Sequence, residues 1–345
     1  MAPIVRDLRG GGKIETLGIV CGEMPSCSGL GEDNESEERM RIRIGLVCMG
    51  LAGVVVAGCA STPPGAGGVP MVQQAEAWRG LHLYFYHQGE IPALKQAIVE
   101  EYAPSGVNVL VLEINYNFQY QSHPELAARK GMTHEQAREI AALCRENGIR
   151  LIPQFNCFGH QSGSWGGDTL ALLKKYPELD VAPEIPANND EIYARSWNPL
   201  HPKTNEIVFA LMDELVDAFQ ADAFHVGMDE VFLFPEEGDP YYEGESNAEI
   251  YAKAVNDYYG HLVGEHGLEM LMWGDRLLPM SEMPHNEYES SANGTAPAAD
   301  MIPKDIIVCD WHYTRRREYP SVGYLLDKGF RVWPATWRSP SAAVV

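Results

Sequence analysis

Two adjacent carboxylates, Asp229 and Glu230, follow the short apolar segment AFHVG at residues 223–227. Adjacent residues of a regular strand point to opposite faces, so both side chains can serve one pocket only where the strand ends and the chain bends. Gly227 permits such a bend. Two carboxylates this close should repel each other, and one is therefore expected to hold its proton at neutral pH. A protonated acid beside an ionised carboxylate is, in outline, an arrangement that cleaves sugars.

Short apolar segments and helical patterns alternate along the chain around this pair. Helical spacing marks residues 133–148 and 205–219. Repeated strand–helix units favour a parallel sheet with helices outside, and seven successive units favour a (β/α)8 TIM barrel over a doubly wound sheet. The first strand also lacks the Gly-rich turn of a dinucleotide-binding fold. The predicted strands are residues 81–86, 107–114, 149–156, 223–227, 268–274, 305–312 and 330–336.

Polar or aromatic residues follow nearly every predicted strand. In a (β/α)8 barrel the active site lies at the carboxyl ends of the strands. A lone Trp or His at such a position more often packs in the core than binds a ligand, so the functional interpretation rests on their convergence at one rim. These residues are Glu113, Asn115, Asn156, His160, Asp229, Glu230, Trp273, Asp275, Asp310, Trp311, His312 and Trp337.

The spacing of the acid pair constrains the mechanism. In most glycosidases the two carboxyl groups flank the scissile bond and lie about 5 Å or more apart. Neighbouring carboxylates can cooperate instead when the substrate supplies its own nucleophile.

The segment FHVGMDEVF resembles the His-x-Gly-x-Asp-Glu signature of family-20 glycoside hydrolases, the β-N-acetylhexosaminidases. The segments WRGLHL, LIPQFNCFGH, MLMWGD and VCDWHY resemble the first, third, fifth and sixth strands of that family. The likeness covers residues 78–345 and is closest to the hexosaminidase D-like branch. It implies a retaining exo-enzyme that acts on glycans ending in N-acetylhexosamine and needs no metal or cofactor.

The resemblance also implies a role for each matching residue. Glu230 would protonate the glycosidic oxygen, and Asp229 would hold the substrate's 2-acetamido group while its carbonyl oxygen attacks the anomeric carbon to form an oxazolinium. His160 would support the acid pair. The implied substrate-binding residues are Arg79, His160, Trp273, Trp311, Trp337, Asp275 and Glu113.

Two other functions stay open from the residues alone. The family's last-strand Trp and acid, which bind the outer sugar hydroxyls, have no counterpart, so a catalytically impaired glycan-binding lipoprotein is the alternative. A metal-dependent barrel hydrolase is disfavoured because the sequence shows no closely spaced His/Asp ligand set.

The first 76 residues differ in composition from the rest. Residues 40–59 have the charged, apolar and small-residue regions of a secretory signal, and their end resembles a bacterial lipobox in which Cys59 is lipidated. We therefore expect a leader at 1–39 that is non-native or disordered, a signal peptide at 40–59, a flexible tether at 60–76 and the barrel at 77–345. This predicts a lipid-anchored protein of the bacterial cell envelope.

Composition limits the partners of the chain. Its 345 residues carry a formal net charge of -22, with no basic run that could follow a phosphate backbone, which excludes nucleic-acid binding. The only membrane contact expected is through the lipid. Cys144, Cys157 and Cys309 are expected to be small core residues rather than a disulfide framework.

The number of predicted strands is too small to close the barrel. A closed barrel of this type needs eight strands, and only seven are predicted. We expect a barrel that is incomplete at its carboxyl end, with unpaired edges at residues 81–86 and 330–336 and correspondingly poor solubility.

Overall fold

The structure, a computed structural model, describes residues 19–23, 77–165, 167–186, 189 and 192–337, and for 19–23 and 337 the backbone alone. The proposed signal peptide, Cys59 and the proposed tether lie outside the described residues. No described helix is long and apolar enough to cross a membrane.

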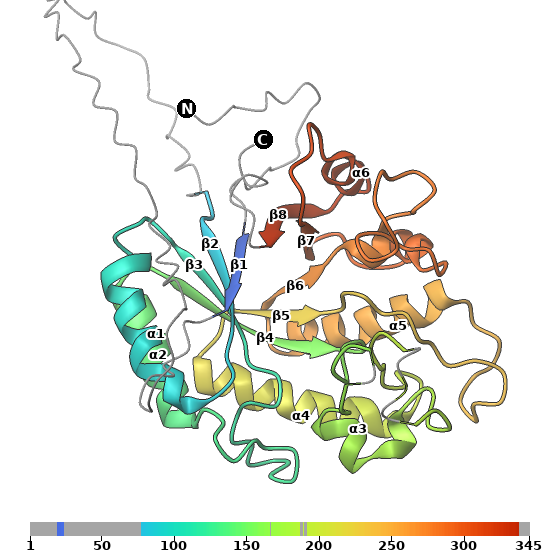
Figure 1. Cartoon of the computed structure of the whole chain (residues 1–345), viewed down its shortest axis with the longest axis horizontal. Helices are drawn as coiled ribbons and strands as arrows, with labels where there is room; N and C mark the ends of the chain where they lie inside the picture. Colours follow the sequence, from blue (N-terminus) through green and yellow to red (C-terminus); the bar gives the residue numbers. More distant parts are fainter. Residues whose placement is uncertain (1–18, 24–76, 166, 187–188, 190–191, 338–345) are drawn as a thin grey trace, which may run out of the picture. The chain divides into compact units, whose positions relative to one another are not determined.

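Eight parallel strands close into a barrel in the order in which they occur along the chain (Figure 1). Each strand pairs in parallel with the next, and β8 pairs with β1. The barrel class predicted from the strand–helix pattern is confirmed. The strands are β1 Ile19–Glu23, β2 Gly80–Tyr84, β3 Val109–Glu113, β4 Arg150–Cys157, β5 Ala223–Gly227, β6 Glu269–Trp273, β7 Ile307–His312 and β8 Arg331–Trp337.

The seven predicted strands are β2 to β8, and the structure adds β1. Val20 of β1 pairs with Leu81 of β2 on one side and with Thr336 of β8 on the other. The expectation of unpaired edges on β2 and β8 is therefore wrong, and so is the assignment of residues 19–23 to a disordered leader. The five residues of β1, IVCGE, include Gly22 and Glu23 and so do not form the continuous apolar run that marks the other buried strands.

Helices lie outside the sheet and cover the strands (Figure 1). Helix α2 begins where predicted, because Thr133 and Gln136 form a reciprocal capping box. Gly148, at φ +70°, then leads from the helix towards β4. The α-helices are α1 Ile91–Ala97, α2 His134–Glu146, α3 Ala171–Lys175, α4 Pro202–Phe219, α5 Asn247–Tyr259 and α6 Pro320–Asp327. Two π-helical segments, η2 Ile98–Tyr102 and η4 Gly260–Glu265, continue α1 and α5. Short 3-10 helices are η1 Gln88–Glu90, η3 Pro177–Leu179, η5 Asp275–Leu277 and η6 Ala296–Asp300.

The alternation of side chains along β3 separates two apolar layers. Val109 and Val111 belong to a buried cluster with Trp273 and Trp333, whereas Leu110 and Leu112 belong to a larger cluster that includes helix residues. A strand buried on both faces reads as a continuous apolar run, as β3 does. The free thiols Cys144, Cys157 and Cys309 are all buried, as expected.

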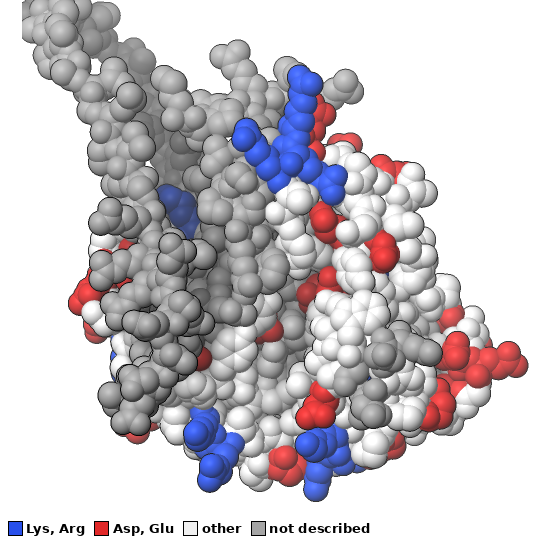
Figure 2. Space-filling model, viewed as in Figure 1, with Lys and Arg blue, Asp and Glu red and all other residues white. Residues whose placement is uncertain are grey.

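Charge on the described surface agrees with the composition. Asp and Glu side chains are spread over the face shown in Figure 2, and Lys and Arg stand in separate groups rather than in a continuous stripe.

Candidate active site

The acid pair lies in a sharply bent segment at the carboxyl end of β5. Gly227, Met228 and Glu230 all have positive φ, at +69°, +74° and +49°. A Cβ at Gly227 would collide with the side chain and backbone of Asn156, so only glycine fits here. The bend predicted from the adjacent carboxylates is confirmed.

Neighbouring elements hold this segment by its backbone. The Tyr251 hydroxyl donates to the carbonyl oxygen of Met228 at 2.9 Å. The Glu230 N–H donates to Asp275 Oδ2 at 2.9 Å, and the Asn293 amide donates to the Val231 carbonyl oxygen at 2.9 Å. Contacts from α5 and from the chain after β6 therefore fix where the two carboxyl groups lie.

His160 lies against both carboxylates, as expected. Its Nε2 is 3.1 Å from Asp229 Oδ2 and 3.3 Å from Glu230 Oε2. Burial opposes a charged imidazole, but Asp229 and Glu230 raise the pKa of His160 well above its ordinary value. The site thus contains a cation between the two acids. Its positive charge offsets the mutual repulsion of the two carboxylates, so neither needs to hold a proton on that account.

Asp229 is ionised, and one of its two carboxylate oxygens accepts no hydrogen bond within the described structure. Burial alone would raise the pKa of Asp229, but the neighbouring His160 lowers it below the ordinary value. Its Oδ2 faces His160, whereas its Oδ1 is buried without a hydrogen-bond partner within the described structure. A buried carboxylate oxygen without a donor is costly, and an N–H group of a ligand would satisfy it.

Asp275 supports the acid pair. Its Oδ2 accepts from Glu230 N–H and from Arg276 Nε, and its Oδ1 accepts from Trp311 Nε1 at 3.1 Å. Burial raises the pKa of Asp275 to about 6. These contacts make Asp275 a positioning residue for Glu230, and its role in substrate binding stays a prediction.

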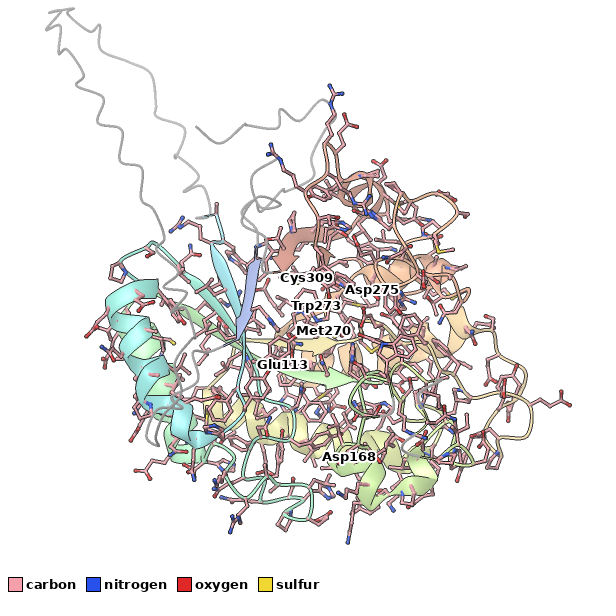
Figure 3. All side chains as sticks on the ribbon, viewed as in Figure 1. Glu113, Asp168, Met270, Trp273, Asp275 and Cys309 are labelled. Atoms are coloured by element: carbon pink, nitrogen blue, oxygen red, sulfur yellow. The ribbon has the colours of Figure 1, made fainter. Side chains whose placement is uncertain are left out.

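Trp273 and Glu113 lie toward the centre of the barrel (Figure 3). The Trp273 ring packs against His225 and His82, with centroids 4.6 Å and 5.4 Å away. Glu113 is buried and accepts hydrogen bonds from Gln154, Asn115 and Asn156. Both oxygens of Glu113 therefore already accept hydrogen bonds from neighbouring amides.

Arg79 precedes β2, so its backbone lies at the amino end of the barrel, roughly 16 Å along the strand from the carboxyl rim. Its guanidinium donates to the Gly106 and Ala77 carbonyl oxygens. These contacts do not include the acid pair, and the role of Arg79 in gripping sugar hydroxyls stays a prediction.

Only the backbone of Trp337 belongs to the described structure. It is the last residue of β8, and its backbone pairs with Cys21 at the carboxyl end of the barrel. Its predicted contact with substrate concerns a side chain outside the described residues.

Tyr193 is a site residue that was not predicted. Burial and the nearby Glu230 side chain raise the pKa of Tyr193. Its ring centroid lies 5.4 Å from Trp165, 5.5 Å from Phe232 and 5.3 Å from Tyr288. These four rings, which we call the aromatic wall, stand beside the acid pair on the loops after β4, β5 and β6. No spacing signal identifies them, since they come from three separate loops.

The ligand atoms of His160, Asp229 and Glu230 lie within 4.8 Å of one another, a spacing that is also compatible with a metal ion. The two carboxylates raise the pKa of His160, so without a metal ion the set is an acid pair with an internal counter-charge.

An acid pair with an aromatic wall, on the carboxyl rim of a (β/α)8 barrel, defines a glycoside hydrolase. The profile of the glycosyl hydrolase family 20 catalytic domain matches residues 114–332, more than half of the chain. The chain belongs to glycosyl hydrolase family 20.

Known proteins similar to this chain carry related descriptions. It is 24% identical over 243 residues to a beta-hexosaminidase of Emericella nidulans, covering 61% of this chain and 34% of that protein. It is 28% identical over 136 residues to hexosaminidase D of Bos taurus, covering 38% of this chain and 34% of that protein. The chain thus spans about a third of the length of either relative.

Solved structures show the same fold. A β-N-acetylhexosaminidase from Bacteroides fragilis aligns with a TM-score of 0.55 at 15% identity, over 78% of this chain and 54% of that one. A chitobiase from Flavobacterium johnsoniae aligns with a TM-score of 0.54 at 21% identity, over 75% of this chain and 38% of that one.

Proposed function

We propose that this barrel is a retaining exo-β-N-acetylhexosaminidase in which the substrate's 2-acetamido group is the nucleophile. The observation that carries the proposal is the buried, unpartnered Oδ1 of ionised Asp229, next to Glu230. It fits the N–H of an acetamido group.

In the proposed first step, the acetamido N–H donates to Asp229 Oδ1, and the acetamido carbonyl oxygen attacks the anomeric carbon. The bond from that carbon to the departing oxygen breaks, and Glu230 gives the oxygen its proton. Asp229 balances the positive charge that develops on the oxazolinium ring. In the second step Glu230 takes a proton from water, which opens the ring with net retention.

The substrate class rests on the same atoms and on the relatives. Glycans ending in N-acetylglucosamine or N-acetylgalactosamine carry the required amide, and the relatives named above are hexosaminidases. The aromatic wall offers apolar faces to a pyranose ring beside the acid pair.

The test compares hydrolysis of chromogenic N-acetylglucosaminide, N-acetylgalactosaminide and glucoside by the full chain. Only the two acetamido sugars should be cleaved, because the glucoside has no internal nucleophile. A thiazoline that mimics the oxazolinium should inhibit more tightly than substrate binds. Cleavage of the glucoside at a comparable rate would refute substrate assistance, and binding without cleavage would favour a glycan-binding protein.

We also propose that Cys59 carries a lipid that anchors the protein in the bacterial cell envelope. The proposal is supported by the signal layout of residues 40–59. Metabolic labelling with a fatty acid should mark the wild-type chain and fail to mark Cys59→Ala. Equal labelling of both would end the proposal.

A further inference from the structure

Two histidines and two carboxylates meet on the outside of the barrel, away from the acid pair. Asp213 comes from α4, and His261, Glu265 and His266 come from η4 and the residue after it. The Nε2 atoms of His261 and His266 lie 2.8 Å and 3.0 Å from the same oxygen, Asp213 Oδ1.

The π-helical turn is what brings the two imidazoles together. The His266 N–H donates to the His261 carbonyl oxygen at 3.3 Å, which is the i to i+5 bond of a π-turn. In an α-helix, residues five apart point about 140° from each other around the axis. Here the two rings are in contact instead, with centroids 4.8 Å apart. Such turns occur frequently at functional sites.

His261 is held in one orientation by its other contacts. Its Nδ1 lies 3.0 Å from Glu265 Oε2, and its ring stacks on Phe209 at 4.2 Å and 3°. The side chain is only 8% exposed. If Nδ1 donates to Glu265, the neutral ring presents the lone pair of Nε2 to Asp213. A carboxylate that orients a histidine through its second nitrogen is the usual arrangement behind a metal-bound imidazole.

We propose that Asp213, His261 and His266 bind a divalent transition metal ion of the zinc type, with Glu265 orienting His261. In a tetrahedral zinc site, ligand atoms about 2.0 to 2.1 Å from the metal lie about 3.3 Å from one another. The two measured distances to Asp213 Oδ1 need to grow by only a few tenths of an ångström. His266 and Asp213 are 35% and 46% exposed, which leaves room for water as a fourth ligand.

The position indicates what the ion would do. It would join the fourth turn of α4 to the chain that leads from η4 into β6, and so link the outer elements on either side of β5. A divalent cation would also neutralise two carboxylates in a chain with a net charge of -22. The ion would therefore act as a clamp on the outer layer rather than in the reaction.

The test titrates chelator-treated full-length protein with Zn²⁺ by calorimetry and repeats the titration on His266→Ala and Asp213→Asn. Wild type should bind one equivalent more than either variant, or bind it at least tenfold more tightly. Zn²⁺ should raise the thermal unfolding midpoint of wild type and not that of the variants. Both changes are at partly exposed positions, so the variants should fold, which circular dichroism verifies.

His123→Ala is the matched control, because His123 faces a single carboxylate, Glu125, at 3.0 Å. It should bind Zn²⁺ as wild type does. The same stoichiometry and affinity in wild type, His266→Ala and Asp213→Asn would overturn the proposal, as would loss of binding in His123→Ala alone. In those cases the cluster is a set of histidines hydrogen-bonded to carboxylates.

Discussion

Glu230 and Asp229 differ in environment although they are neighbours in the chain, and the proposed chemistry depends on that difference. Glu230→Gln removes the proton donor, so cleavage of substrates with poor leaving groups should fall below detection, whereas activated aryl glycosides should retain some turnover. Asp229→Asn should lower kcat by on the order of 10²-fold, because a preorganised electrostatic partner is lost. Steady-state kinetics on both substrate types measure this. Near-normal turnover in both variants would contradict the roles assigned to the pair.

Tyr193 offers a test of the contact that the sequence did not reveal. Tyr193→Phe keeps the ring in the aromatic wall and removes the hydroxyl that lies beside Glu230. A hydrogen bond between uncharged groups contributes about 0.5 to 1.5 kcal/mol, so loss of one from this hydroxyl to the acid should lower kcat/KM by roughly 2- to 10-fold. Tyr288→Phe, in the neighbouring ring 5.3 Å away, is the control and should change kcat/KM much less. Equal effects would mean that the wall acts through packing alone.

At the scale of the element, the turn after β5 depends on Gly227. Gly227→Ala adds a Cβ at φ +69° and against Asn156. Gly148→Ala is a matched control, since Gly148 has φ +70° and nothing within 4 Å of the added carbon. The backbone conformation alone should cost each variant about 1 to 2 kcal/mol of unfolding free energy. Gly227→Ala should lose about 1 to 3 kcal/mol more, together with activity. Denaturant unfolding measures the free energy of unfolding of both variants. Equal losses would show that Asn156 moves aside to accommodate the added carbon.

His312 at the end of β7 should make stability depend on pH. Burial opposes its charge, but Asp310 and Glu289 raise the pKa of His312 to about 9. A raised pKa contributes stability in full below the unfolded value of about 6.5, and that contribution is lost as pH rises through about 9. His312→Gln should therefore lose less stability than wild type between pH 6.5 and 9, whatever its stability at pH 6. Denaturation midpoints across this range measure the two slopes, and parallel slopes would exclude His312 as the cause.

The strands β2 to β8 could be predicted because buried parallel strands are apolar runs between helix caps and turn residues. The acid pair could be predicted because its motif and its bend belong to one local segment, and His160 could be predicted because it follows the neighbouring strand, β4. Tyr193 and the support from Asp275 could not, since they depend on how separate loops fold over the rim.

At the scale of the whole molecule, one mature chain cannot both contain β1 and be cleaved at the proposed lipoprotein signal. Cleavage before Cys59 would remove β1, which pairs with both β2 and β8. If β1 stabilises the barrel, a chain beginning at Met40 should unfold at lower denaturant concentration and associate more than the 345-residue chain, because two strand edges are left open. Val20→Pro in the full chain should weaken closure in the same direction. Identical stability and a monomeric state in all three would show that β1 is dispensable.

The left-handed backbones at the carboxyl rim have a consequence for engineering. Asn115, Phe158, His160, Met228 and Glu230 all have positive φ, between +48° and +74°, and all follow β3, β4 or β5. Each non-glycine residue held there costs the folded state on the order of 1 kcal/mol or more, and the cost falls on the segments that carry the reacting groups. A search for thermostable variants should therefore find its gains at this rim and lose turnover with them, whereas gains on the outer helices should leave turnover intact. The segments after β3, β4 and β5 that would supply the reacting groups are thus the same segments whose backbone conformation lowers thermal stability.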